Sequence, residues 1–363
     1  MTGPLSPETP PIGGRYKISG WINAGGMQHV YLAEDQLFGR VVALKTPKDD
    51  TGARRFTQSA IVSAKVNHTN VAKTLDYLEA AGGRAVLIEE LVEGADLETV
   101  LAGGLPYLPP MTVARLLHQL AKGLAASHHV KVVHRDLKPS NIMIVGGWKF
   151  EQAKITDFGI AKMAEQEIGA WADSQGNTQS KTVLGAIPYM SPESVENFRR
   201  YDMPSDVWSI AAIAYRLLSG EPPFGGGLSS VARILQAVPP PPPIHLAPVQ
   251  FRGLGGQLHS IILKCLNKDP RARPTAAQLV TECETLCYSM VPYELGTISR
   301  TNGATGFIRA DGGSDLMYYT GNFYGRQRKI EEGQRVWFQR GPGHPNDRAF
   351  PIVQLLPPVP RPA

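Results

Sequence analysis

Residues 134–141 read His-Arg-Asp-Leu-Lys-Pro-Ser-Asn, and residues 157–159 read Asp-Phe-Gly. The tripeptide alone is weak evidence for any fold or function. The two stretches in this order, with Asp157 sixteen residues after Asn141, form a combination that is very specific to one class of site. Other short motifs precede and follow them along the chain. These motifs are Val-Ala-Leu-Lys at 42–45, Ser-Pro-Glu at 191–193, Ser-Asp-Val-Trp-Ser at 205–209, and Arg273 after Lys-Asp-Pro at 268–270.

The hydrophobic pattern around these motifs changes along the chain. β-Branched runs at 41–44 and 85–88 predict strands, and apolar residues at helical spacing predict one helix over 54–66 between them. Beyond Gly94 the pattern becomes helical, and it predicts a small β-rich lobe followed by a larger helical lobe. The helices expected in the larger lobe cover 113–127, 205–218 and 257–266.

The ordered set of motifs resembles the protein-kinase family, and most closely the bacterial-type serine/threonine kinases. The resemblance covers about residues 16–287. It implies an α+β fold class with a two-lobed protein-kinase fold. It also implies ATP as the phosphoryl donor, Mg²⁺ as the metal, and a protein substrate whose Ser or Thr hydroxyl accepts the phosphate.

The resemblance assigns roles to four polar residues of the two central stretches. Asp136 would accept the proton of the substrate hydroxyl, and Lys138 would neutralise charge on the moving phosphoryl group. Asn141 and Asp157 carry hard oxygen ligands, which suit a Mg²⁺ ion that bridges phosphates. We therefore expect Asp136 and Lys138 to be catalytic and the other two residues to hold the metal.

The nucleotide is expected between the two lobes. Lys45 would pair with the α- and β-phosphates, and the backbone of the inter-lobe hinge at 88–91 would bind adenine. In the large lobe, Glu193 and Arg273 resemble the family's buried ion pair. The nucleotide-binding residues that the resemblance implies are Lys45, Asn23, Gly25, Gly26, Val30, Ala43, Glu89, Leu91 and Met143.

The phosphate-covering loop at 22–31 departs from the family pattern Gly-x-Gly-x-x-Gly. Gly25 is kept, whereas Asn23 and Gln28 replace the other two glycines. Asn tolerates left-handed backbone angles, so Asn23 is a mild change. Gln28 is a stronger one, because it puts a side chain where the backbone would approach phosphate.

The lysine partner is the second departure. Active kinases pair the strand lysine with a glutamate from a helix, and that position falls on Ser59 here. Because no Asp or Glu occurs from 51 to 75, the predicted helix cannot supply a carboxylate in any register. Ala186 is a third departure, at a position where the family usually has threonine.

These departures leave two hypotheses. In the first, the chain is an active kinase with a loosened nucleotide site, and the intact Asp136, Asn141 and Asp157 favour it. In the second, it is a catalytically impaired pseudokinase that acts as a nucleotide-sensing scaffold or an RNA-binding regulator. A carboxylate from elsewhere at the Lys45 ammonium would favour the enzyme.

The segment between Asp157 and Glu193 suggests regulation. It contains Thr178, Ser180 and Thr182, and a phosphate on one of them could pair with Arg135 and order the segment. A solvated Ser/Thr-rich loop is the alternative.

Residues 296–355 have strand-like segments separated by glycine-containing turns, which predicts a small all-β barrel or sandwich. Gly-Phe-Ile at 306–308 and the strand-like run at 315–319 are similar to the cold-shock domain, an OB-type barrel. The resemblance implies that single-stranded RNA or DNA would stack on Phe307, Met317 and Tyr319. Eight basic residues oppose five acidic ones in this region, and the net charge of +3 favours modest, salt-sensitive binding. Protein docking, or packing on the kinase lobes, is the alternative.

The composition bounds the remaining possibilities. The chain has 363 residues and a net charge of +5. It contains no run of about 18 apolar residues without a charged one, so no membrane span or membrane partner is expected. Three cysteines, Cys265, Cys283 and Cys287, fit neither a disulfide framework nor a four-ligand zinc site. The start carries no recognisable secretory signal, and a cytoplasmic location is the simplest expectation.

The predicted organisation is a flexible leader at 1–14, a protein kinase domain at 15–288, a cold-shock-like β-barrel at 294–357 and a tail at 358–363. The proline run at 239–243 is expected to be a loop inside the helical lobe, with a polyproline ligand as the alternative. Cys283 and Cys287 are expected on one helix as core or interface thiols.

Overall fold

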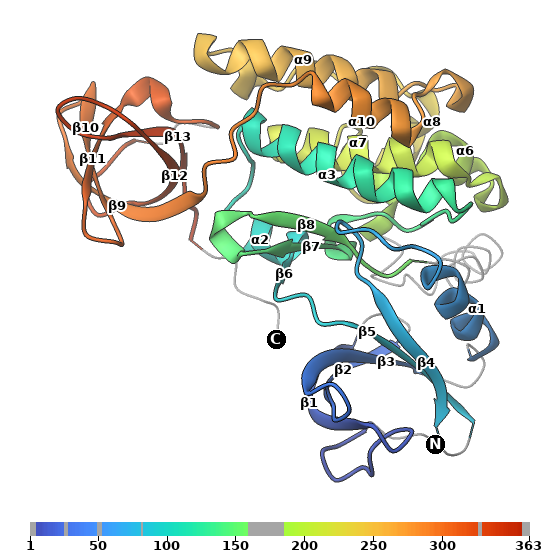
Figure 1. Ribbon diagram of the computed structural model, residues 1–363. Coiled ribbons are helices and arrows are strands. Elements are labelled where there is room, and N and C mark those ends of the chain that lie inside the picture. The colour runs from blue at the N-terminus through green and yellow to red at the C-terminus, as the bar shows by residue number, and fades with distance from the viewer. Residues whose placement is uncertain are drawn as a thin grey trace.

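The computed structural model describes residues 5–24, 28–48, 53–80, 83–158, 185–325 and 329–357 (Figure 1). A small sheet lobe is followed by a helical lobe, and a barrel lies beside the helical lobe. The architecture is therefore the predicted one: two lobes of mixed helix and sheet, and then a small all-β OB-type barrel.

The small lobe is built on an antiparallel sheet in the order β1-β2-β3-β5-β4. Alternate residues of β5 enter different cores, because side chains alternate across a strand: Val86 and Ile88 face one core, while Ala85 and Leu87 face Phe56 of helix α1. The elements are β1 Tyr16–Ala24, β2 Gln28–Asp35, β3 Arg40–Pro47, α1 Ala53–Ser63, β4 Thr74–Ala80 and β5 Arg84–Glu90.

The helical lobe is organised around α7, Met203–Ser219, which is buried along most of its length. A capping box between Asp202 and Ser205 starts α7, and Gly220 ends it with a left-handed φ of 91°. The other helices are α2 Leu97–Ala102, α3 Pro110–His129, α6 Pro192–Glu196, α8 Ser230–Gln236, α9 Val249–Cys265 and α10 Ala276–Glu284.

A three-stranded sheet in the order β6-β7-β8 lies between these helices and the small lobe. Its strands are β6 Gly94–Asp96, β7 Ile142–Val145 and β8 Gln152–Ile155. Short 3₁₀ turns complete the two lobes and the barrel: η2 Pro139–Asn141, η3 Gly147–Lys149, η4 Ile187–Tyr189, η5 Phe198–Arg200, η6 Ile244–Leu246, η7 Pro270–Ala272 and η8 Thr320–Asn322.

The C-terminal strands close into a barrel in the order β10-β11-β13-β12-β9. Ile308, Leu316 and Phe338 fill its interior. Gly306 is required there, because a Cβ atom would lie 2.4 Å from the Tyr318 hydroxyl. The strands are β9 Tyr293–Thr301, β10 Thr305–Ala310, β11 Asp315–Tyr319, β12 Arg335–Gly341 and β13 Arg348–Gln354.

One side of the barrel is packed against the helical lobe. Trp337 stacks on Tyr293 with ring centroids 3.5 Å apart, and its Nε1 donates to the Trp148 carbonyl at 2.6 Å. The Tyr324 hydroxyl donates to the Leu218 carbonyl of α7 at 2.8 Å. Tyr293, Tyr324 and Trp337 belong to the same hydrophobic core as the helical lobe, so the barrel packs on this lobe as a third part of one structure.

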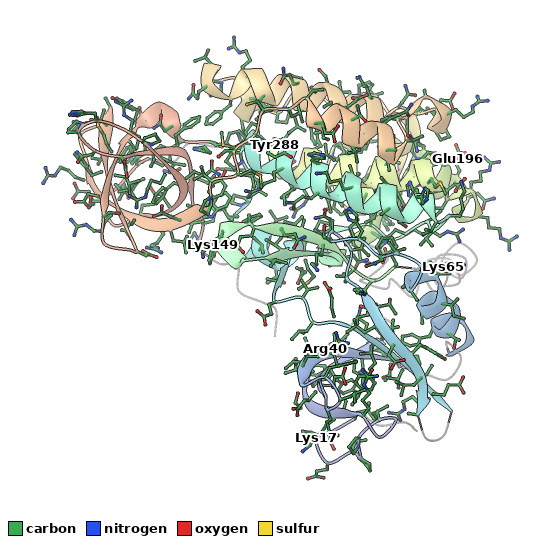
Figure 2. All side chains as sticks on the ribbon, in the orientation of Figure 1. Lys17, Arg40, Lys65, Lys149, Glu196 and Tyr288 are labelled. Atoms are coloured by element: carbon green, nitrogen blue, oxygen red, sulfur yellow. The ribbon has the colours of Figure 1, made fainter. Side chains whose placement is uncertain are left out.

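The connection to the barrel is fixed to α3 as well. In the view with all side chains, Tyr288 lies at the start of this connection and Lys149 at the tip of the β7–β8 hairpin near the barrel (Figure 2). The Tyr288 hydroxyl lies 2.6 Å from His118 Nδ1 of α3.

The structure confirms the expected helix after β3 and the expected loop at the proline run. One expectation about the cysteines is wrong. Residues 239–243 form a loop between α8 and η6, with Pro240 and Pro243 buried. Cys283 is buried on α10, but Cys287 is exposed and lies outside that helix, which ends at Glu284, so the expectation of one shared helix is wrong. Within the described residues, no helix is both long and apolar enough to cross a bilayer.

Candidate active site

The loop before β7 folds back on itself and gathers three polar side chains. Lys138 Nζ lies 2.8 Å from Asp136 Oδ2, and Asn141 Nδ2 donates to the same oxygen at 3.1 Å and to the Asp136 carbonyl at 2.7 Å. The η2 turn makes this possible, because it reverses the chain between Lys138 and Asn141. The side chain of Asp136 keeps 23% of its surface exposed, so it remains accessible to a substrate.

The base of this loop is held by Asp206 of α7, whose side chain is fully buried. Asp206 accepts the backbone N–H of His134 at 2.9 Å and of Arg135 at 3.1 Å. Its pKa is lowered although burial opposes the shift, because His128 and the backbone donors stabilise the carboxylate. Arg135 has a left-handed φ of 71°, and Asp206 stabilises this strained backbone.

His134 ties the loop to the segment that carries Asp157. His134 Nε2 lies 2.8 Å from the Thr156 carbonyl, and its ring meets Phe158 edge-on, with centroids 4.6 Å apart. The Thr156 N–H donates to the Asn141 carbonyl at 3.0 Å. Asp157, the next residue, is therefore brought beside the loop at 134–141, and the buried His134 links the two segments.

Lys45 of β3 bridges two carboxylates where the two lobes meet. Its Nζ lies 2.6 Å from Glu89 Oε2 and 2.7 Å from Asp157 Oδ1. Lys45 and Glu89 are only 6% and 5% exposed. Gln28 Nε2 also donates to Asp157 Oδ1, at 2.9 Å.

The electrostatics of this cluster keep the lysine charged. Burial acts to lower the pKa of Lys45, but Asp157 and Glu89 together raise it above its usual value. Burial also opposes the charged form of Asp157, yet Lys45 and Gln28 hold the pKa of that carboxyl below its usual range. Burial raises the pKa of Glu89, and Lys45 opposes that shift.

The other residues implied for nucleotide binding lie around Lys45 or outside the described part of the structure. Val30 pairs directly with Lys45, and Ala43 pairs with Glu89. Met143 lies on β7 and Leu91 directly after β5. Gly25 and Gly26, the side chains of Asn23 and Ser59, and the candidate phosphorylation sites Thr178, Ser180 and Thr182 lie outside the described residues.

Glu89 was expected as a hinge residue that binds nucleotide, and its contact with Lys45 is the main feature that the motifs did not predict. Glu89 and Lys45 lie on neighbouring strands, with Lys45 opposite Leu87 and Glu89 opposite Ala43. A strand-pairing analysis of 42–45 with 87–90 would have placed both side chains on one face.

The donor atoms fit the expected metal in chemistry. Asp157 offers a carboxylate whose side chain is 25% exposed, and Asn141 offers its amide oxygen, since its Nδ2 is engaged with Asp136. Both are hard oxygen ligands of the kind that Mg²⁺ prefers. The described residues contain no group of three or more His, Cys, Asp or Glu side chains that would form a complete protein cage.

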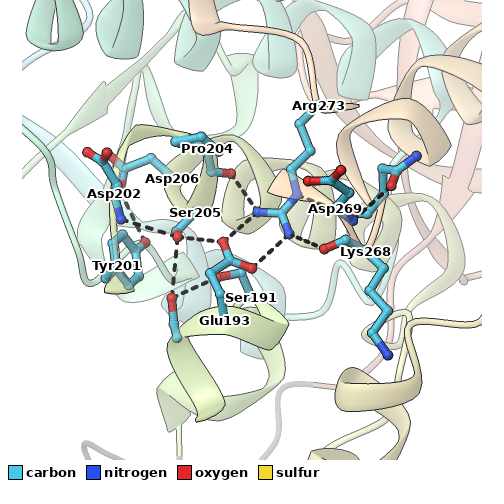
Figure 3. Close-up of polar contacts among 12 residues, drawn as sticks. Ser191, Glu193, Tyr201, Asp202, Pro204, Ser205, Asp206, Lys268, Asp269 and Arg273 are labelled. Atoms are coloured by element: carbon cyan, nitrogen blue, oxygen red, sulfur yellow. Dashed lines mark hydrogen bonds and ion pairs between the residues drawn. The ribbon is translucent and has the colours of Figure 1, made fainter. Parts of the chain in front are cut away.

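A second ion pair lies within the helical lobe, between Glu193 of α6 and Arg273 (Figure 3). Arg273 donates to both oxygens of Glu193, at 2.7 and 2.8 Å, and Ser205 Oγ donates to Glu193 Oε1 at 2.8 Å. The Arg273 side chain is fully buried, and its Nη1 and Nη2 also donate to the carbonyls of Pro204 and Lys268. The expected buried ion pair of the large lobe is therefore present.

A sheet lobe and a helical lobe meet where Lys45 contacts Glu89 and Asp157, and Lys138 and Asn141 contact Asp136 in the loop before β7. This arrangement is typical of the protein-kinase class. The family model described as "Protein kinase domain" matches residues 16–283, which is most of the chain. The chain therefore belongs to the protein kinase family.

Curated relatives agree with this membership. The chain is 35% identical to serine/threonine-protein kinase pkn2 of Myxococcus xanthus over 291 residues, which cover 78% of this chain and 34% of that relative. It is 34% identical to serine/threonine-protein kinase PknB of Mycobacterium leprae over 282 residues, 75% of this chain and 43% of the relative. The chain thus matches only about a third to a half of the length of these relatives.

Proposed function

We propose that this chain transfers the γ-phosphoryl group of ATP to Ser or Thr hydroxyls of protein substrates. The observation that carries the proposal is the contact set of the cleft, in which Asp136, Lys138 and Asn141 interact at 2.8–3.1 Å and Lys45 bridges to Asp157 at 2.7 Å. Phosphoryl transfer depends on such positioning and charge neutralisation more than on covalent chemistry.

Each residue of the cleft has a defined task in this proposal. Asp136 accepts the proton of the substrate hydroxyl, and Lys138, which already contacts Asp136, neutralises charge on the transferred group. Lys45 binds the α- and β-phosphates, while Asn141 and Asp157 hold Mg²⁺, which bridges phosphate oxygens when bound. Val30, Ala43, Leu91 and Met143 would form the walls around adenine.

The pseudokinase alternative loses its main support. That alternative depended on the absence of a carboxylate for Lys45, and Glu89 supplies one at 2.6 Å. A charge partner for the lysine therefore accompanies the residues that we propose as the base and the metal ligands.

The test is phosphoryl transfer from radiolabelled ATP with Mg²⁺, to the chain itself and to a generic basic protein, by the wild type and by Asp136→Asn. A missing general base costs about 10²–10⁴-fold in rate, so the variant should lose nearly all label. Because the substitution keeps the shape of the side chain, circular dichroism should match the wild type. Equal labelling by both proteins would contradict the proposed function.

We also propose a second function for the outer face of the barrel, which is binding of single-stranded RNA or DNA. Arg300, Phe307, Met317 and Arg348 are successive partners across β9, β10, β11 and β13, so their side chains share one face. Tyr319 is 40% exposed, and the Arg348 guanidinium lies 5.6 Å from its ring centroid. Aromatic groups flanked by arginines suit stacked bases and their phosphates.

Titration of labelled single-stranded RNA into the full chain at low salt tests this second function. Stacking contributes about 1–3 kcal/mol per base, so Phe307→Ala with Tyr319→Ala should weaken binding by about tenfold or more. Phe38→Ala is the matched control, because Phe38 is a 65% exposed aromatic of the small lobe. Equal affinity of the double variant and the control would retire the idea and leave the barrel as a packing domain of the kinase.

The domain boundaries belong to the proposal as well. We place the kinase domain at 15–288 and the cold-shock-like barrel at 294–357. The break between them falls in the segment between α10, which ends at Glu284, and β9, which begins at Tyr293.

A further inference from the structure

Helix α1 brings no carboxylate to Lys45. Its sequence, Ala-Arg-Arg-Phe-Thr-Gln-Ser-Ala-Ile-Val-Ser, contains no acidic residue. Its described contacts are neutral: Phe56 and Ala60 pack on the sheet, and Ser63 Oγ donates to the Phe158 carbonyl at 2.9 Å. These contacts fix the helix to the sheet and to Phe158.

Glu89 reaches Lys45 from within the sheet. Strand β5 pairs with β3 so that Lys45 lies opposite Leu87 and Glu89 opposite Ala43. Lys45 and Glu89 are therefore diagonal neighbours on one face, a spacing of about 7–8 Å that two long side chains can bridge. The backbone pairing of two adjacent strands sets this contact, and no movement of a helix is needed to form it.

The burial of the pair makes the contact strong and hard to replace. Both side chains are about nine-tenths or more withdrawn from solvent, and Oε2 lies 2.6 Å from Nζ. Asp157, the other partner of Lys45, is 25% exposed and is the residue proposed to bind the metal. A metal ion bound to Asp157 would weaken the ion pair between Asp157 and Lys45. Glu89 is buried and is not proposed to bind the metal, so its ion pair with Lys45 would remain.

We propose that Glu89 is the positioning residue of Lys45, in place of a helix glutamate, and that the pairing of β3 with β5 places this carboxylate where it holds the lysine ready for phosphate. This inference rests on the proposed phosphoryl transfer for its kinetic consequence, but not for its consequence on nucleotide binding.

The experiment compares Glu89→Gln, which keeps the shape and removes the charge, with Glu79→Gln, the same change at an exposed residue of β4. Two quantities are measured: kcat/KM for ATP, and the Kd of a non-hydrolysable ATP analogue with and without Mg²⁺. Glu89→Gln should lower kcat/KM by about 100-fold, the cost of a misplaced reacting group, and should weaken binding of the Mg²⁺ complex. Glu79→Gln should match the wild type in both quantities.

A conservative variant distinguishes a positioning role of Glu89 from a purely structural one. Glu89→Asp keeps the charge but is shorter, so it should recover part of the lost kcat/KM and of the lost affinity. If Glu89→Gln does not fold, judged by circular dichroism, the comparison of Glu89→Asp with the wild type decides, and equal kinetics would overturn the inference.

Two outcomes remain distinguishable. Wild-type kcat/KM and Kd in a folded Glu89→Gln variant would overturn the role of Glu89 and leave the kinase activity intact. A wild type that binds the analogue but transfers no phosphate would overturn the proposed function, while the Kd comparison would still decide the role of Glu89.

Discussion

Two buried ion pairs of this chain, Glu193–Arg273 and Lys45–Glu89, serve different purposes. Arg273 is fully buried, and it is saturated by the two oxygens of Glu193 together with backbone carbonyls. Lys45 shares its single ammonium group between two carboxylates, and Asp157 keeps 25% of its side chain exposed. The first cluster is closed, whereas the second opens onto the cleft.

The difference shows what distinguishes a structural charge from a working one. Every strong donor of the closed cluster is used inside the protein, so its loss should affect stability. The open cluster has more negative charge than its lysine neutralises, which leaves attraction for a cation such as Mg²⁺. Its loss should affect ligand binding and phosphoryl transfer.

The largest expected effect comes from breaking the closed pair. Arg273→Met would leave the Glu193 carboxylate buried without its partner, which costs about 3–5 kcal/mol in the free energy of unfolding. Chemical denaturation followed by circular dichroism measures this loss. The same preparation, assayed below its unfolding midpoint, should keep its affinity for the ATP analogue.

The matched control removes both charges. Glu193→Gln combined with Arg273→Met should be less unstable than Arg273→Met alone, because no uncompensated charge remains. Equal stability of the single variant and the wild type would show that the closed pair does not support the fold.

A smaller effect is expected at the open cluster, from Gln28. Its amide donates to Asp157 Oδ1 at 2.9 Å, the same oxygen that contacts Lys45. Gln28→Ala would remove a competitor for that oxygen, worth about 1 kcal/mol or roughly fivefold, and should lower the Mg²⁺ concentration needed for half-maximal binding of the ATP analogue.

The opposite result would also be informative. If Gln28→Ala needs a higher Mg²⁺ concentration than the wild type for half-maximal binding, Gln28 contributes to nucleotide binding instead of competing for Asp157. The open cluster would then resemble the closed one in needing all of its donors.

The sequence was sufficient for the parts of the site that are local. The family resemblance led us to expect the loop at 134–141 and Asp157 in one site, and in the structure a short turn and one strand pair separate them. The lobes and the barrel could be predicted from hydrophobic period and turn residues, and Glu193 with Arg273 from the family resemblance.

The features that the sequence did not predict depend on which distant segments of the chain meet in the fold. A search for a helix carboxylate could not find Glu89, because its contact with Lys45 follows from the pairing of β3 with β5. Packing of the barrel on the kinase lobes was one of the alternatives, but Trp337 and Tyr293 could not be named for it, because two strand aromatics look the same in sequence whether they face a ligand or another domain.

The central claim is that Asp157 and its neighbours hold a metal–triphosphate complex in the open cluster. The most direct measurement is calorimetric titration of a non-hydrolysable ATP analogue, with and without Mg²⁺, into the wild type and Asp157→Asn. We expect Mg²⁺ to tighten binding to the wild type and to have little effect on the variant. An equal response to Mg²⁺ in both proteins, or no binding by the wild type, would contradict the account.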